Sequence, residues 1–156
     1  MEKPKKKILA ENRKARFEYH IEDTFEAGIV LKGTEVKSLR QGRVNLKDAY
    51  ANIKNGEVWV HQMHIGTYPF AYYGNHEPLR PRKLLLHKRE IHKLFGRVNE
   101  QGRTLIPLRI YFKGGKVKLT LALASGKRKY DKRDAIRRRD EKRELDRARK
   151  EYTSRY

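Results

Sequence analysis

The stretch TLIPLRIYFKGGKVKLTLAL, residues 104–123, decides the fold. In its first half, apolar side chains fall at every second position: Ile106, Leu108, Ile110 and Phe112. The second half continues this alternation: Val117, Leu119, Leu121 and Leu123. A period of two is typical of a strand with one buried face, and Gly114-Gly115 permits a tight turn between the halves. The sequence therefore predicts a long antiparallel hairpin.

Shorter patterns before this hairpin predict further strands. Asn55-Gly56 lies between the apolar runs 50–53 and 58–60, and this dipeptide supplies the two positive φ angles of a type I′ hairpin turn. Alternating apolar residues also predict a strand around Phe17, Tyr19 and Ile21, and the segment 27–31 repeats the pattern. Together these segments indicate six short strands.

Two helices are expected between the strands. Thr34 is a plausible helix N-cap, and Gly42 is placed to end a helix of about two turns. A second helix is predicted from about Lys88 to Glu100, with Gly102 as its stop. One face of it is apolar: Ile91, Leu94, Phe95 and Val98.

The fold class that these segments favour is mainly β, a small six-stranded OB-like barrel with about three short helices and a basic C-terminal tail. Closure removes the exposed edges that short strands would otherwise present. The same patterns fit an SH3-like barrel or a curved open sheet. We expect a basic N-terminal lead over 1–14, an RNA-binding barrel over 15–125 and a basic tail over 126–156.

The charge of the chain points to a polyanionic partner. Its 39 Lys and Arg against 19 Asp and Glu give a formal net charge of +20, and a nucleic-acid backbone rewards each neutralised phosphate by releasing counterions. No apolar run approaches the ~20 residues of a membrane-spanning helix, and no signal peptide is expected. The chain has no cysteine. We therefore expect a cytoplasmic monomer without membrane contact, metal or cofactor.

Catalysis is not expected. The most suggestive candidates for acid–base cleavage of RNA are His20, Glu26, His61 and His64. His61 and His64 are three apart, so a regular strand would point them to opposite faces. No nucleotide-binding or hydrolase motif accompanies them.

Two stretches combine charge or aromatic residues with irregular patterning. Residues 69–82, PFAYYGNHEPLRPR, predict a long loop whose aromatic rings either stack on unpaired bases or pin the loop to the barrel. Cations on both sides of 84–86 either bind phosphate or form a solvated face. Lys37 and Arg40 lie three apart on the first helix, where they can grip one backbone together.

The tail from Gly126 is densely charged and poor in apolar side chains. Ile136 and Leu145 are the only large aliphatic residues between Gly126 and Arg149. We predict a tail that is disordered when free and helical when bound to RNA. A salt-bridged helix that is present at all times is the alternative.

Three blocks of the sequence carry a family resemblance: EAGIVLKGTEVKSLR at 26–40, RKLLLHKREI at 82–91 and GKRKYDKR at 126–133. With ENRKARFEY at 11–19 and IPLRIYF at 106–112, they make nearly the whole chain resemble the SsrA-binding protein (small protein B) family. The resemblance implies an OB-type adaptor of trans-translation that catalyses no reaction. It would bind the tRNA-like domain of transfer-messenger RNA and deliver that RNA to stalled ribosomes, with its tail in the decoding region and the empty messenger channel. A structural ribosomal or ribosome-assembly protein is the alternative.

Carried over by position, the resemblance and the basic clusters give a candidate RNA-binding set on the barrel. Its members are Asn12, Lys14, Arg16, Glu26, Lys32, Lys37, Arg40, Arg82, Lys83, Leu85, His87 and Lys88. The family often has Asn at the position of His87. Glu26 either accepts hydrogen bonds from RNA, orients a neighbouring cation, or holds loop amides as a buried structural residue.

The candidate ribosome-binding residues lie in the tail. They are Lys127, Arg128, Lys129, Tyr130, Lys132, Arg133, Arg137 and Arg138.

Overall fold

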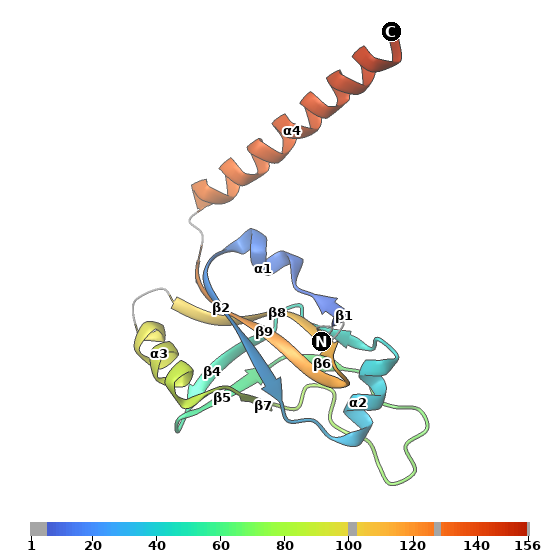
Figure 1. The fold of residues 1–156 in the computed structure, drawn as a ribbon, viewed down its shortest axis with the longest axis vertical. Coiled ribbons are helices and arrows are strands. Elements are labelled where there is room, and N and C mark those ends of the chain that lie inside the picture. The colour runs from blue at the N-terminus through green and yellow to red at the C-terminus, as the bar shows by residue number, and fades with distance from the viewer. Residues whose placement is uncertain (1–5, 100–102, 127–128, 156) are drawn as a thin grey trace. The chain divides into compact units, whose positions relative to one another are not determined.

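The computed structural model describes residues 6–99, 103–126 and 129–155 (Figure 1). The chain divides into two compact units, one ending at Gly126 and the other beginning at Lys127. Each unit is described by itself.

The predicted long hairpin is confirmed. Strands β8 (Arg103–Lys113) and β9 (Lys116–Gly126) pair antiparallel along their length. Gly114 and Gly115 make the turn with φ angles of 57° and 76°, which glycine adopts without steric cost. The other edge of β9 pairs with β2 (Tyr19–Ile29).

The hairpin and four further strands close into a six-stranded ring. Pairing continues from β2 to β7 (Arg82–Leu85), to β5 (Glu57–His61), to β4 (Tyr50–Lys54) and back to β8. The β4–β5 turn has positive φ at Asn55 (53°) and Gly56 (73°), as the type I′ prediction requires. The mainly β class is thus confirmed, and the closed ring is consistent with an OB-like barrel rather than an open sheet.

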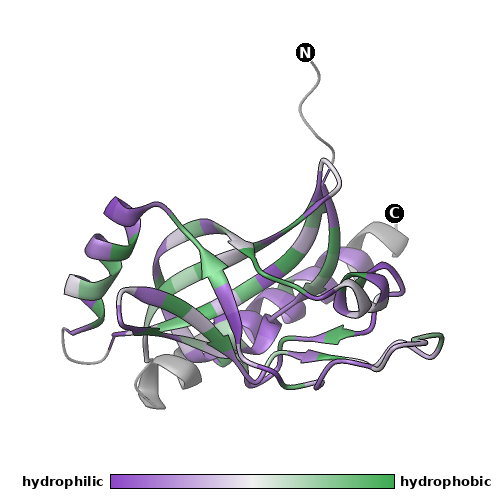
Figure 2. Cartoon of the chain, turned by 90° about the horizontal axis from the view of Figure 1, so that it is seen from below, coloured by the Kyte–Doolittle hydropathy of each residue, from purple (hydrophilic) through white to green (hydrophobic). Residues whose placement is uncertain are grey.

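The buried apolar residues form two clusters. The larger one collects side chains from all six strands of the ring, and the smaller one joins Ala15 of α1 to Ile106, Leu108 and Ala122 of β8 and β9. Figure 2 shows hydrophobic positions alternating with hydrophilic ones along the strands. The inward half of the alternation is fully buried, for example at Val58, Val60, Leu119 and Leu121. Burial of each such side chain contributes about 1.5–3 kcal/mol to the free energy of folding. The side chains that point outward do not belong to this core and can serve in binding.

The two expected helices are present. α2 spans Gly33–Arg40 and α3 spans Lys88–Val98. The N-cap of α2 is Lys32 rather than Thr34, because the Glu35 carboxylate accepts the Lys32 amide at 2.8 Å. Gly42 follows α2 with a φ of 72°, as its predicted stopping role requires. The predicted stop at Gly102 lies outside the described residues.

Tyr19 and Ile21 lie in a strand as predicted, at the start of β2, but two features of the N-terminal segment differ from the expectation. Residues of the expected lead form strand β1 (Lys6–Glu11), which pairs with β8. Phe17 lies in helix α1 (Arg13–Glu18), not in a strand. The helix forms because the Asn12 side chain accepts the Ala15 amide and caps it, a local bond that outweighs a short alternating pattern. A small separate pair, β3 (Val44–Asn45) and β6 (His64–Ile65), was not predicted.

The second unit is the helix α4, Lys129–Arg155. Its two large aliphatic residues, Ile136 and Leu145, are exposed, and Arg137 pairs with Glu141 at 3.9 Å one turn later. This is one ion pair of the kind that the alternative interpretation, a salt-bridged helix, expects. Ordering of the tail on RNA stays a prediction, which circular dichroism with and without RNA tests.

Candidate RNA interface

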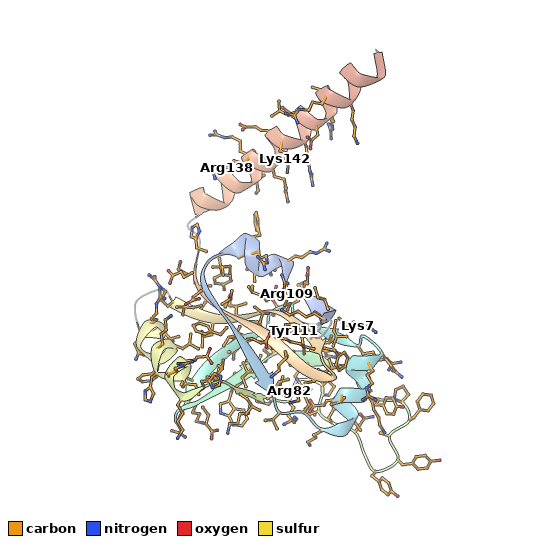
Figure 3. The ribbon with its side chains drawn as sticks, in the orientation of Figure 1. Lys7, Arg82, Arg109, Tyr111, Arg138 and Lys142 are labelled. Carbon is orange, nitrogen blue, oxygen red and sulfur yellow. The ribbon has the colours of Figure 1, made fainter. Side chains whose placement is uncertain are left out.

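Outward side chains of β2, β8 and β9 form one polar face. Register places Tyr111 opposite Lys118, Arg109 opposite Thr120, and Glu26 opposite Thr120 on the other side of β9. Directly paired residues share a face of a sheet. We call this surface the Glu26 face; its members are Lys6, Glu26, Arg109, Tyr111, Lys113 and Lys118. Figure 3 labels Arg109 and Tyr111 on the ring unit.

Glu26 is the centre of this face. Its carboxylate accepts the Tyr111 hydroxyl at 2.5 Å and the Lys113 ammonium at 3.1 and 3.2 Å. The Lys6 ammonium lies 5.1 Å from the centroid of the Tyr111 ring. Glu26 therefore orients a neighbouring cation, as one prediction held. The alternative of a buried carboxylate that holds loop amides is wrong, since Glu26 is exposed and bonds side chains.

These contacts shift two pKa values in opposite directions. The Tyr111 hydroxyl bond, with help from Lys113 and Lys6, lowers the pKa of Glu26 although partial burial opposes the change. Burial, together with the Glu26 carboxylate, raises the pKa of Tyr111 to about 12. At neutral pH Glu26 is therefore ionised at the surface, and the buried Tyr111, which donates to it, is neutral.

Leu85 adjoins the Glu26 face although it is far from Glu26 in sequence. Strand pairing puts Leu85 opposite Gly28, two residues after Glu26. A Cβ on Gly28 would lie 3.3 Å from the Leu85 Cβ, so glycine allows the close approach. Leu85 is half exposed, and His87 and Lys88 follow it on the surface at the start of α3. The fold thus brings Glu26 and Leu85 together, as the proposed site requires.

Arg82 corrects the predicted RNA-binding set. Its side chain is fully buried, and its guanidinium donates to the Glu35 carboxylate and to the Met63 carbonyl at 2.6 Å. It also donates to the Pro78 carbonyl at 3.2 Å. These interactions occupy its nitrogens inside the protein, so Arg82 belongs to the fold and not to an RNA surface.

Glu35 holds this internal cluster together. It also accepts the Arg80 guanidinium at 2.5 Å. Burial acts to raise the pKa of Glu35, but the Lys32 amide and the Arg80 and Arg82 guanidinium groups more than offset it, so the pKa is lowered. A buried charge is tolerated when it is paired and hydrogen-bonded in this way.

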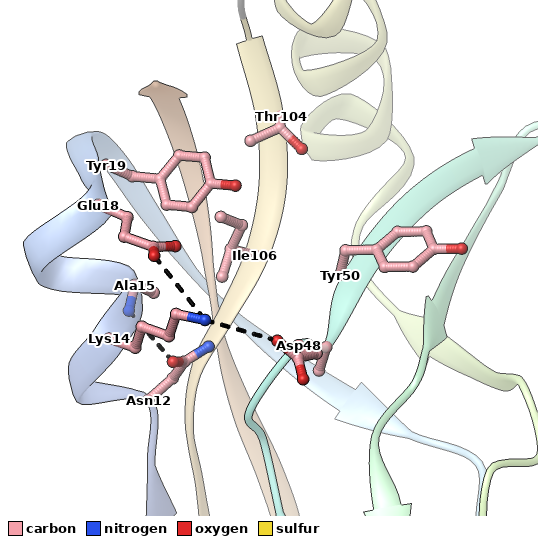
Figure 4. Close-up of a pocket in the computed structure, with 10 residues that line it drawn as sticks. Asn12, Lys14, Ala15, Glu18, Tyr19, Asp48, Tyr50, Thr104 and Ile106 are labelled. Carbon is pink, nitrogen blue, oxygen red and sulfur yellow. Dashed lines mark hydrogen bonds and ion pairs between the residues drawn. The ribbon is translucent and has the colours of Figure 1, made fainter. Parts of the chain in front are cut away.

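The predicted residues of the 11–19 block have mixed positions. Asn12 is buried and donates to the Leu46 and Pro107 carbonyls at 3.3 Å, which makes it structural. Figure 4 shows Lys14 between Glu18 and Asp48, 3.8 Å from each, beside a hollow of about 360 Å³. Arg16 is exposed.

The remaining predicted cations of the ring unit do not form one patch. Lys37 lies 5.4 Å from the Tyr68 ring centroid, and Lys83 pairs with Glu57 at 3.3 Å. Arg40 lines a hollow with Lys7 and Gly115, at the tip of the β8–β9 hairpin. Lys32 is exposed next to α2. Arg40 therefore lies near β1 and the β8–β9 turn, and Lys83 lies on β7, which pairs with β2 of the Glu26 face.

The loop 66–81 carries exposed aromatic rings. No helix or strand lies between Ile65 and Arg82, which confirms the loop. Phe70 is 71% exposed, and Tyr72 and Tyr73 are essentially fully exposed. The exposure of Tyr72 and Tyr73 contradicts the prediction that these rings pin the loop, whereas the Phe70 ring meets the Tyr68 ring edge-on, with 5.6 Å between their centroids. Asn75 closes the base of the loop with hydrogen bonds to the Tyr68 amide (3.0 Å) and carbonyl (2.7 Å).

For the tail candidates, the structure fixes the helical backbone and a few side chains. Arg137 and Arg138 are exposed. Lys127 and Arg128 lie outside the described residues. Four others lie on the helix with side chains outside the description: Lys129, Tyr130, Lys132 and Arg133.

The sequence-based prediction missed all four cations of the Glu26 face: Lys6, Arg109, Lys113 and Lys118. A signal was present in the deciding stretch itself. Between the apolar positions of β8 and β9 stand Arg109, Tyr111, Lys113, Lys116 and Lys118, so the outward half of this hairpin is a cationic row.

Within the described part of the chain, no helix is long and apolar enough to cross a membrane. The same residues contain no group of three or more His, Asp or Glu side chains placed to hold a metal ion.

The fold and the site define a small closed-ring β protein with a cationic outer face and a separate basic helix. The SmpB protein family model matches residues 9–151, so the chain belongs to that family. It is 58% identical to the SsrA-binding protein of Acetivibrio thermocellus, covering 97% of this chain and 98% of the relative. It is 63% identical to the SsrA-binding protein of Symbiobacterium thermophilum, covering 90% and 89%.

A solved structure extends this relation to three dimensions. It is reported as "tmRNA-SmpB: a journey to the center of the bacterial ribosome". The match has a TM-score of 0.66 and 47% identity, and it covers 84% of this chain and 95% of that one.

Proposed function

We propose that this protein is the RNA-binding adaptor of trans-translation, which binds the tRNA-like domain of transfer-messenger RNA and delivers it to stalled ribosomes. The observation that carries the proposal is the meeting of Glu26, Leu85 and the cations of β8 and β9 on one face, in a chain whose relatives are named SsrA-binding proteins. The protein acts by binding, without a reaction, metal or cofactor of its own, as a monomer in the cytoplasm.

The Glu26 face is suited to a folded RNA because it combines phosphate-binding cations with one fixed carboxylate. A carboxylate cannot pair with phosphate. Glu26 instead holds Lys113 in place, and its free lone pairs can accept a 2′-hydroxyl or a base amino group. Such a contact distinguishes RNA of one shape from any other polyanion.

The two units have different roles in binding. The Glu26 face selects the folded RNA, with Lys32, Lys37, Arg40, Lys83, His87 and Lys88 as flanking contacts. The tail, with its basic residues from Lys127 to Arg138, recognises the stalled ribosome by binding in the empty messenger channel.

The test compares the intact protein with a form that ends at Ser125. We expect both to capture transfer-messenger RNA from cellular RNA equally, and only the intact protein to support peptide tagging on stalled ribosomes. Loss of RNA capture on truncation would contradict the division of labour. Failure of the intact protein to enrich transfer-messenger RNA over ribosomal RNA would contradict the proposed function itself.

A further inference from the structure

Figure 1 shows the strands β4 and β5, which pair as a hairpin of the ring. The outer face of this hairpin carries aromatic and amide side chains that the proposed function does not use. Register pairs Asn52 with Trp59 and Tyr50 with His61. The residues between them, Ala51, Val58 and Val60, are buried in the core. Alternation therefore turns the aromatic rings outward. We call this surface the Trp59 face.

Two rings of the Trp59 face, those of Tyr50 and His61, are held in place by contacts with their neighbours. The His61 ring stacks on Tyr50 with a centroid distance of 5.2 Å and an interplanar angle of 22°. Its Nε2 lies 2.9 Å from the Asn52 Oδ1. Tyr50 is nevertheless 45% exposed, and Trp59 and His61 are half-buried. A preformed aromatic surface loses little entropy when a flat ligand stacks on it.

A hollow of about 540 Å³ opens on this face. Its volume is within the range of sites that hold small ligands. Aromatic, amide and charged side chains line it: Trp59, His61, Asn52, Asn55, Lys54 and Glu57. Lys83, which is paired with Trp59 across β5 and β7, binds Glu57 at 3.3 Å and neutralises it. Lys54 is left as the exposed cation on the rim.

We propose that the Trp59 face binds an unpaired RNA base, stacked on Trp59, with its edge near Asn52 or Asn55 and its phosphate toward Lys54. An aromatic ring, amides and a cation are the combination that recognises single-stranded RNA, because every base has a face to stack and an edge to hydrogen-bond. A base inside a duplex is covered by its neighbours and cannot enter. The inference depends on the proposed function only in that the ligand is RNA.

The test uses the fact that Trp59 is the only tryptophan of the chain. The fluorescence of the intact protein is titrated with a single-stranded oligouridylate of about eight nucleotides, a length within the site sizes of OB folds. We expect saturable quenching by the single strand and a much weaker response to a duplex of equal length. Equal quenching by the duplex, or none by either RNA, overturns the proposal.

Variants of Trp59 and His61 distinguish base stacking from non-specific electrostatic attraction between the protein and RNA. Trp59→Phe keeps an aromatic ring and should bind a labelled oligouridylate nearly as the parent does, whereas Trp59→Leu should weaken binding about 5- to 100-fold. His61→Ala, which leaves the core intact, should weaken it less and keep the fluorescence signal. Circular dichroism checks that each variant is folded. Equal affinity of Trp59→Leu, His61→Ala and the parent contradicts the proposal.

A further pair of measurements keeps the inference distinct from the proposed function. Binding of the tRNA-like domain is measured for Lys113→Gln/Lys118→Gln, and oligouridylate quenching is measured for the same variant. We expect the first to weaken and the second to remain. A parent protein that fails to bind the tRNA-like domain but still shows single-strand quenching would refute the proposed function and leave the Trp59 face standing.

Discussion

Two glutamates of the ring unit each hold cations, yet one cluster lies inside the protein and the other on its surface. The Glu35 and Arg82 side chains are both 0% exposed, whereas those of Glu26 and Lys113 are 37% and 34% exposed. In the inner cluster the Arg82 donors end on protein oxygens. In the outer cluster Lys113 keeps contact with solvent. A strongly basic chain therefore uses its cations for two purposes, and counting them does not tell the two apart.

The physical cost of losing a partner differs between the clusters. Removing one member of a buried pair strands a charge in a medium that solvates it poorly. Removing one member of an exposed pair costs little, because water replaces the lost partner. Stability measurements should therefore respond to the Glu35 cluster, and RNA binding to the Glu26 face.

The largest expected effect is that of Arg82→Met. Removal of the guanidinium leaves the Glu35 carboxylate buried with fewer donors, so the free energy of unfolding should fall by about 3–5 kcal/mol. Urea unfolding followed by circular dichroism measures it. Arg80→Met, at a position that is 25% exposed, is the matched control and should lose much less. Equal losses of unfolding free energy in the two variants would contradict the claim that burial of the guanidinium decides the cost of removing it.

The next effect concerns RNA and salt. Lys113→Gln/Lys118→Gln removes two cations of the Glu26 face. The slope of log affinity against log salt concentration, for the tRNA-like domain, should become shallower by about 2. Filter binding over a range of salt concentrations gives the slope. Lys93→Gln/Lys142→Gln removes equal charge from α3 and α4 and should change the slope far less. The same change in both variants would show that only net charge matters.

A smaller effect is the acid dependence that Glu26 adds to stability. Its pKa is lowered below 4.5 in the folded state, so its contribution is present above about pH 4.5 and disappears as pH falls through the folded pKa. Unfolding of the parent and of Glu26→Gln should therefore differ most at neutral pH and converge in acid. A gap that widens as pH falls is incompatible with this assignment.

The smallest effect is spectroscopic. The pKa of Tyr111 is raised to about 12 by burial and by the Glu26 carboxylate. The difference in phenolate absorbance between the parent and Tyr111→Phe should therefore appear near pH 12. The folded form retains this proton between pH 10 and 12, so the contribution of Tyr111 to stability falls with rising pH in that window. A difference in phenolate absorbance centred near pH 10 would show that the Tyr111 hydroxyl is neither buried nor bonded to Glu26.

Much of the ring was predictable because its signals are local. The glycines at 114–115 and the Asn55-Gly56 pair each make a tight turn, and alternation sets the buried face of β4, β5 and β9. In β8 the register shifts between Pro107 and Arg109, so Ile106 and Leu108 lie in a different buried cluster from Ile110. The prediction for the N-terminal segment failed because the structure of that segment depends on partners that are distant in the sequence. β1 exists as an added edge on β8, and Asn12 is fixed by carbonyls of Leu46 and Pro107.

The site was predictable only in part, for a related reason. The resemblance pointed to Glu26 and Leu85, and the strand register brings them together. Charge clustering wrongly included Arg82, because sequence shows a cation but not its burial beside Glu35. Lys113 and Lys118 were not predicted, because polar residues that alternate with apolar ones are the ordinary pattern of a strand with one solvated face.

The most direct test of the account measures both unfolding free energy and affinity for the tRNA-like domain in Glu26→Gln and in Glu35→Gln. We predict opposite results: Glu26→Gln stays within about 1 kcal/mol of the parent in stability and loses RNA affinity, while Glu35→Gln loses several-fold more stability and, where folded, binds RNA as the parent does. If Glu26→Gln kept full affinity, or lost as much stability as Glu35→Gln, the separation of an inner cluster for folding from an outer face for RNA would be contradicted.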